Sequence, residues 1–203
     1  RFTLPPCCAG RKEMSLVIAF CGKERAFMAG DRREIFFSGN DSATGRLEEE
    51  LYSGEIWDEE GLFRRAGKLG VRLFVHDGKC KVTERNGVLV GEVSESEGEQ
   101  KRTRRLLVTA GTYAISEIRE GKEVEVARGQ ASRFIVLGNR VMQEVANWCI
   151  RSCWKENGGS PADALRVILV TMKEAAAATP SVSRGYTLVQ TTRCGAPETG
   201  PGG

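Results

Sequence analysis

The sequence predicts an α+β fold in which helices cover a sheet. Its first two thirds carry short apolar runs bounded by turn residues, which are typical of strands. Two segments with helical spacing of apolar residues follow, and one more strand-like run comes after them. Strands first, then two helices and a returning strand, are the pattern of a helix-covered sheet. The chain of 203 residues, 40% of them hydrophobic, is long enough to bury such a core.

A buried hairpin is predicted near the start of the chain. Residues 16–20 (LVIAF) and 26–30 (AFMAG) are continuous apolar runs separated by Gly22-Lys23-Glu24. We therefore expect two largely buried antiparallel strands joined by a tight turn. A third strand, over residues 34–38, follows Asp31-Arg32-Arg33.

The middle of the chain combines a charged helical stretch with further strands. Residues 46–69 set leucines among many charges and predict two short surface helices, inside an insertion at about 40–70. The charged stretch 94–105 predicts an exposed loop or hairpin tip. Strand-like runs are found at residues 71–75, 88–93, 106–110, 112–118, 124–127 and 134–137.

The C-terminal third is predicted to be helical, with one last strand. Residues 141–153 place apolar side chains at helical spacing on one face. A second helix is expected over residues 160–178, where Ser160 can cap the first turn and Asp163 can complete a capping box. A strand over residues 186–191 ends the pattern.

Composition excludes several classes of protein. The 30 Lys+Arg against 27 Asp+Glu give a formal net charge of +3, without the concentrated basic face of a dedicated nucleic-acid binder. No apolar run approaches the roughly 18 residues that a membrane span needs. The single histidine, His76, excludes a mechanism or metal site built on several imidazoles. Hydroxyl, thiol, carboxylate and amine chemistry remain.

The two ends of the chain differ from its middle. Residues 1–13 show no apolar period and no signal-peptide pattern, and residues 193–203 are rich in Gly and Pro, so both flanks are expected to be tails. We divide the chain into a non-native or removed extension (1–14), a catalytic domain (15–192) and a disordered tail (193–203). Three of the seven cysteines lie in the tails, and Cys149 and Cys153 are expected in the core, so we predict a reduced, cytoplasmic protein without a metal.

Ser15 is the candidate nucleophile. It follows Met14 at the mouth of the first predicted strand, and removal of an initiator Met14 would make Ser15 the mature N-terminus. Such a residue carries a hydroxyl together with a free α-amine, whose pKa of about 7.7–8.0 allows it to accept the hydroxyl proton near neutral pH. The predicted hairpin returns Asp31 to the same end, where a carboxylate can orient the hydroxyl and a nearby lysine can lower its proton affinity.

This arrangement resembles the proteasome β-subunit type of N-terminal nucleophile hydrolase. The match runs from Ser15 through Gly22-Lys23 to Asp31 and Arg33. The chain is more similar still to the proteasome-related connectase family of methanogenic archaea, whose members include a protein ligase. The segments MSLVIAF, MAGDRREI, EEELYSGEI, GVLVGEV and TPSVS carry this resemblance over residues 14–191.

The resemblance implies an αββα sandwich of two antiparallel sheets flanked by helices. It also implies site roles: Ser15 takes the nucleophile position, Asp31 the acidic position and Arg33 a supporting one. The activating lysine best matches Lys81, with Lys79 and Lys68 as alternatives. A later loop keeps a hydroxyl at Ser183.

The chain departs from the proteasome pattern in two ways. Its nucleophile is Ser15 instead of Thr, which keeps the hydroxyl but removes the methyl group that fixes its rotamer, and two of its loops differ. Gly138-Asn139 stands where proteasome subunits carry Gly-Ser, and the acidic residue of the later loop falls on Pro180. Loss of that carboxylate weakens the case for an ordinary proteasome peptidase.

The resemblance favours a sequence-specific transpeptidase that needs no cofactor. Ser15 would form an acyl-enzyme ester, which the amine of a second polypeptide resolves. Phe63, Arg64 and Arg65 are the candidate peptide-recognition surface. The alternatives are a hydrolase of the same fold and a non-enzymatic binding module. The implied substrate contains a Lys-Asp-Pro-Gly-Ala type motif, as in a subunit of the membrane methyltransferase of methanogenesis, and the implied state is a monomer without nucleic acid or membrane insertion.

Overall fold

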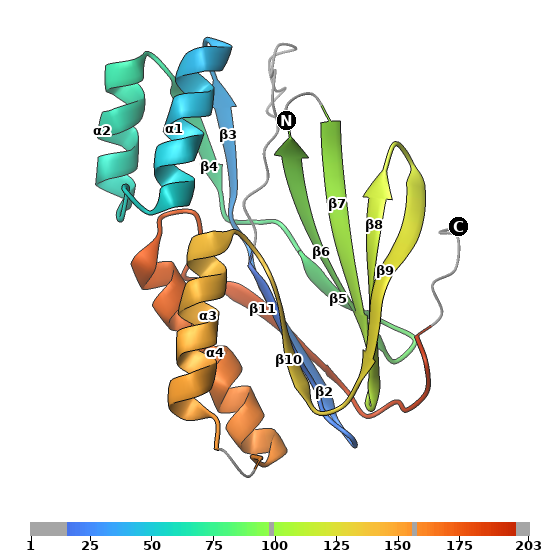
Figure 1. Cartoon of the computed structure of the whole chain (residues 1–203). Helices are drawn as coiled ribbons and strands as arrows, with labels where there is room; N and C mark the ends of the chain where they lie inside the picture. Colours follow the sequence, from blue (N-terminus) through green and yellow to red (C-terminus); the bar gives the residue numbers. More distant parts are fainter. Residues whose placement is uncertain (1–15, 98–99, 156–157, 198–203) are drawn as a thin grey trace.

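Two antiparallel sheets stack on each other in the computed structural model, which describes residues 16–97, 100–155 and 158–197 (Figure 1). The four-stranded sheet has the order β10 (Arg133–Leu137), β1 (Val17–Cys21), β2 (Ala26–Asp31) and β11 (Tyr186–Thr191). The five-stranded sheet has the order β5 (Val82–Arg85), β6 (Val88–Glu97), β7 (Gln100–Val108), β8 (Thr112–Arg119) and β9 (Lys122–Gln130). The predicted α+β fold with two antiparallel sheets is confirmed.

The predicted hairpin of β1 and β2 lies at the centre of the molecule, and both of its strands are buried throughout. Alternate side chains of β1 point to opposite faces. Ile18 belongs to the apolar cluster beneath the helices, whereas Val17 and Ala19 belong to the cluster between the two sheets. A strand with two apolar faces therefore fits only this middle position.

Four helices lie on the same side of the four-stranded sheet (Figure 1). They are α1 (Asp41–Ser53), α2 (Glu59–Leu69), α3 (Arg140–Cys153) and α4 (Pro161–Ala178). The capping box predicted for α4 is present, because Ser160 Oγ accepts from Asp163 N at 3.2 Å and Asp163 Oδ2 accepts from Ser160 N at 2.8 Å. Among the described residues, none of the helices has the length and apolarity needed to cross a bilayer.

The insertion forms a small unit of its own, attached at the end of β2. Its helices α1 and α2 pack against a two-stranded ribbon made of β3 (Glu34–Ser38) and β4 (Arg72–His76). Helix α1 begins earlier than predicted because Asn40 Oδ1 accepts from Ser42 N at 2.9 Å and caps it.

The prediction of a loop or hairpin tip over residues 94–105 is wrong for most of its length. Strands β6 and β7 stay paired out to Glu97 and Gln100. Strand β7 pairs with β6 on one side and with β8 on the other in this stretch, and these backbone ladders hold as strands residues whose charge alone predicts a loop.

The first residues of the C-terminal flank, 193–195, bond to residues 109 and 110, which follow β7 of the five-stranded sheet. Ala110 N donates to Arg193 O at 2.8 Å, and Thr109 Oγ1 donates to Gly195 O at 2.6 Å. Residues 1–15 and 198–203 lie outside the described residues, and so does the predicted boundary at 14–15.

Candidate active site

The site is built where β2 ends beside the start of β1. Leu16, the residue after the candidate nucleophile, donates its N–H to Asp31 Oδ1 at 2.8 Å, and Asp31 N donates to Leu16 O at 3.1 Å. The hairpin therefore brings the Asp31 carboxylate to the beginning of β1, as the sequence predicts. Ser15 itself lies outside the described residues.

Lys81 completes a buried ion pair with Asp31. Its Nζ donates to Asp31 Oδ1 at 2.8 Å and Oδ2 at 2.9 Å, and to the carbonyl oxygen of Arg33 at 2.6 Å. The side chains of Asp31 and Lys81 are both 0% exposed. Removing two charges from water is costly, and a buried pair is tolerated only when further hydrogen bonds satisfy it.

The Asp31 carboxylate is fully used as an acceptor. Each oxygen accepts from Lys81 and from one backbone N–H: Oδ1 from Leu16 and Oδ2 from Arg33, the latter at 2.9 Å. A carboxylate offers about four acceptor positions, so all of them are occupied. Asp31 thus fixes the ammonium group of Lys81 and the first residues of β1 in one geometry.

The other two candidate lysines point elsewhere. Lys79 Nζ pairs with Glu34 Oε1 at 2.9 Å, and Lys68 lines a hollow of about 580 Å³ between α1 and α2. Of the three lysines, the fold brings Lys81 to Asp31. His76 is 66% exposed and lies 3.8 Å from Glu34, away from this pair.

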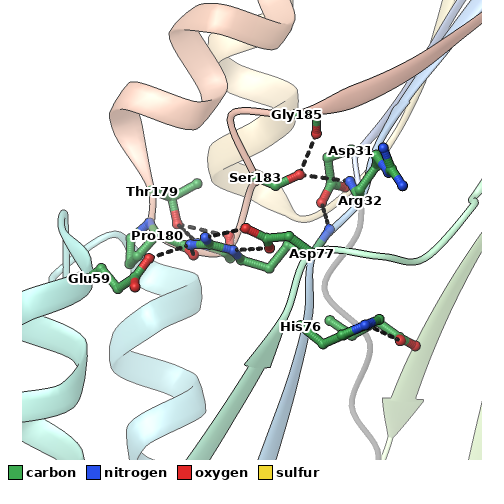
Figure 2. Close-up of polar contacts among 12 residues, drawn as sticks. Asp31, Arg32, Glu59, His76, Asp77, Thr179, Pro180, Ser183 and Gly185 are labelled. Carbon is green, nitrogen blue, oxygen red and sulfur yellow. Dashed lines mark hydrogen bonds and ion pairs between the residues drawn. The ribbon is translucent and has the colours of Figure 1, made fainter.

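Arg33 joins the site to the insertion and to the loop after α4. Its Nε and Nη2 donate to the two Asp77 oxygens at 2.7 and 2.8 Å, and its Nη1 donates to Glu59 Oε2 at 2.9 Å and Pro180 O at 2.8 Å. Figure 2 shows Asp77, Glu59 and Pro180 converging from three separate segments. The hydrogen bonds from Arg33 lower the pKa of the Asp77 carboxyl, and the bond to Asp77 raises the pKa of Arg33 in turn.

Ser183 holds the loop after α4 against the end of β2. Its Oγ accepts from Arg32 N at 2.8 Å and donates to Gly185 O at 2.5 Å, and the side chain is buried (Figure 2). The hydroxyl therefore bonds to the backbone of Arg32 and Gly185 beside Asp31 and not to the carboxylate itself.

The candidate recognition residues stay on α2 and do not join the Asp31 cluster. Arg64 pairs with Glu60 along the helix at 2.5 Å, Arg65 pairs with Glu50 of α1, and Phe63 is 46% exposed. They form part of the surface of the insertion.

Sequence reasoning missed the two carboxylates that hold Arg33. Pro180 has no carboxylate to offer, but its carbonyl accepts from Arg33, and Asp77 and Glu59 of the insertion supply the negative charge. These contacts join residues 26 to 147 positions apart. Asp77 stands out in the sequence His76-Asp77-Gly78, but no local pattern indicates that it pairs with Arg33.

The chain has a family match and a set of distant structural neighbours. Residues 14–199 match the family model described as Connectase MJ0548-like, N-terminal domain. No curated protein sequence matches the chain.

Three solved structures are similar at low identity. The helical assembly of the Anbu complex from Pseudomonas aeruginosa is 11% identical, with coverage of 87% of this chain and 81% of that chain and a TM-score of 0.41. Anbu (ancestral beta-subunit) from Yersinia bercovieri is 11% identical, with coverage of 87% and 80% and a TM-score of 0.40. Eukaryotic HslV from Trypanosoma brucei is 14% identical, with coverage of 88% and 99% and a TM-score of 0.38.

Proposed function

The chain belongs to the connectase family, and from this premise we propose that it is a sequence-specific protein ligase with Ser15 as an N-terminal nucleophile. The resemblance seen in the sequence is confirmed at the level of the family. The observation that carries the proposal is the convergence of Leu16 N–H and Lys81 Nζ on the buried Asp31 carboxylate. Ser15 is covalently bonded to Leu16, whose N–H the Asp31 carboxylate holds. Consecutive Cα atoms are about 3.8 Å apart, so the nucleophile is attached directly to this cluster.

The proposed reaction proceeds in two acyl transfers. Ser15 Oγ attacks a peptide carbonyl while its α-amine accepts the hydroxyl proton, and that proton passes to the departing amine of the C-terminal fragment. The N-terminal fragment remains as an ester on Ser15. The amine of a second polypeptide then attacks the ester, which releases Ser15 and forms a new peptide bond.

The surrounding residues support this chemistry without taking the proton. The ammonium group of Lys81 stabilises negative charge on Ser15 Oγ, since a nearby cation lowers the proton affinity of a hydroxyl. Asp31 positions Lys81 and Leu16. Arg33 positions the end of β2 through its bonds to Asp77 and Pro180. Ser183 does so through its bonds to Arg32 and Gly185. No cofactor takes part.

The proposed substrates are polypeptides with a Lys-Asp-Pro-Gly-Ala type motif, of which a methanogenesis methyltransferase subunit is one candidate. The surface of α2 with Phe63, Arg64 and Arg65 is proposed to contact the substrate at some distance from the reacting bond. Monomeric action in the cytoplasm and a source among methanogenic archaea also stay proposals.

The test is a ligation assay with protein whose first residue is Ser15, checked by N-terminal sequencing. The protein is incubated with a peptide that contains the motif and with a second peptide whose N-terminal amine serves as the acceptor. We expect a joined product by mass spectrometry from this protein, and none from the Ser15→Ala variant.

The other outcomes identify the alternatives. Hydrolysed acid without a joined product would indicate a hydrolase of the same fold. Unchanged peptide and no acyl adduct, with a verified Ser15 terminus, would indicate a binding module. A matched protein that keeps residues 1–14 should be inactive, because its Ser15 carries an amide where the base is needed.

A further inference from the structure

The inner face of the five-stranded sheet changes from apolar to charged as β7 runs away from the core. Residues two apart on a strand share a face, so Arg104 and Arg102 lie on the same face as the buried core residue Leu106. Arg104 is paired in register with Val93 of β6 and with Glu117 of β8. One step further out, Arg102 is paired in register with Glu95 of β6 and with Arg119 of β8.

The strand positions of Arg104 and Arg102 lie close to the proposed active site. Gly91 of β6 lies directly against β1, since a Cβ on it would meet Val17 Cγ1 at 2.7 Å. The next residue, Glu92, donates its N–H to Lys81 O at 2.9 Å. Val93, which belongs to the same buried cluster as Val17, and its partner Arg104 follow next along the same strands.

Among the described side chains, the guanidinium groups of Arg102, Arg104 and Arg119 face one carboxylate, that of Glu117. Glu117 is shared, because it accepts from Arg102 Nη2 and, at 3.4 Å, from Arg119 Nη2. Arg104 has no hydrogen bond or ion pair to any described residue. The Nε atoms of Arg102 and Arg104 are both buried and lack an acceptor.

On the opposite face of the same strand, Arg105 has partners for its guanidinium group. Arg105 donates to Glu92 Oε1 at 2.7 Å and to Glu123 Oε2 at 2.5 Å. Leaving a buried donor without a partner is destabilising, and more so for a charged group. The two unpaired guanidinium Nε atoms among the described residues of β7 therefore both lie on its inner face.

We propose that Arg104, assisted by Arg102, binds a carboxylate of the polypeptide substrate, namely an acidic residue close to the bond that Ser15 attacks. Guanidinium groups bind carboxylates through paired N–H bonds, and such bonds are strongest where water is excluded. This inference rests on the proposed function for the identity of the ligand. It adds a specificity-determining subsite that depends on β7 and not on the insertion.

The experiment measures peptide binding without acyl transfer. The protein begins at residue 15 and carries Ser15→Ala, and a fluorescent peptide with the Lys-Asp-Pro-Gly-Ala motif is titrated beside its Asp→Asn analogue. We expect the Asn peptide to bind the parent about 10-fold more weakly, as for loss of a buried charge-assisted bond. In Arg104→Met the two peptides should bind equally.

Arg105→Met is the matched control, because it removes a guanidinium from the next residue on the other face and should keep the preference for Asp. Arg104→Met should unfold at the parental temperature or above it, since it removes an unpaired charged group. If Arg104→Met fails to fold, Arg104→Gln replaces it in the same titration.

Three results would overturn the subsite: equal binding of both peptides by the parent, a retained preference for Asp in the Arg104 variant, or no binding of either peptide. The proposed function fails separately. If Arg104→Met removes the preference for the Asp peptide but the ligation assay gives no joined product, the subsite is supported and the ligase activity is not. Equally fast ligation of the Asn peptide would leave the ligase standing without the subsite.

Discussion

Two ion-pair clusters start within three residues of each other and differ in burial and in what they connect. Asp31 and Lys81 are 0% exposed and lie against the first residues of β1. Arg33 pairs with Asp77 and Glu59, whose side chains are 46% and 53% exposed, at the border of the insertion. The first cluster is buried inside the core of the fold. The second connects that core to the insertion.

The difference in burial suits the two clusters to different roles. A pair without access to water holds its charges at fixed positions, which suits the stabilisation of a developing charge on Ser15. A partly solvated pair is weaker, because water and salt compete with it, but it can still align the segments that it joins. Variants of the first cluster should therefore abolish chemistry, and variants of the second should impair it.

The largest effect is expected for Lys81→Met. It leaves the Asp31 charge buried and unpaired, which should lower the free energy of unfolding by about 3–5 kcal/mol. Acylation should slow by about 10²–10³-fold, as for loss of a preorganised electrostatic group. Urea unfolding and single-turnover acylation measure the two effects.

The double variant Asp31→Asn, Lys81→Met distinguishes stability from catalysis. Removing both charges should recover most of the lost stability, because no buried charge remains unpaired, while acylation stays slow. Recovery of acylation together with stability would show that Lys81 has a structural role only.

A smaller effect is expected for Arg33→Gln. The variant loses its bonds to Asp77, Glu59 and Pro180, and we expect a loss of about 1–2 kcal/mol after allowance for the exposed partners. The acylation rate constant should fall about 10-fold while KM changes little, because Arg33 positions the site and does not touch substrate. Arg140→Gln, in an exposed helical pair with Glu144, is the control and should match the parent.

The stability that the Arg33 cluster provides should also depend on pH. The pKa of Asp77 is lowered from its ordinary value of 3.8, so its stabilising effect is complete above that value and is lost as the pH falls below it. The difference in thermal midpoint between the parent and Asp77→Asn should therefore shrink between about pH 5 and about pH 3. An unchanged difference across this range would contradict the role of the Asp77 charge.

The smallest effect is expected on the surface of α2. Phe63→Ala and Arg64→Ala leave the Asp31 and Arg33 clusters intact, so stability and the acylation rate constant should stay parental. If this surface contacts the substrate, KM should rise by about 2–5-fold, in the range of a single peripheral contact. A parental KM in both variants would remove these residues from the recognition surface.

The hairpin of β1 and β2 and the capping box of α4 could be predicted because their signals are local. Continuous apolar runs with a Gly-containing turn determine the first, and Ser160 with Asp163 determines the second. The pairing of Asp31 with Lys81 required the family resemblance, since 50 residues separate them.

The remaining features depend on contacts that no local pattern records. The extension of β6 and β7 depends on backbone pairing between strands, which the pattern of a single strand does not reveal. The Arg33 bonds to Asp77 and Glu59 depend on how the insertion folds back on the core. That Arg104 has no partner among the described residues becomes visible only when the two faces of β7 are known.

The most direct test of the account is the intact mass of the protein during reaction. Protein that begins at Ser15 is mixed with the motif peptide without an acceptor and is then analysed by mass spectrometry. The account predicts an added mass equal to the acyl group of the N-terminal fragment, located on Ser15 and lost when an acceptor amine is supplied. An unmodified mass in a folded protein with a verified Ser15 terminus would contradict it.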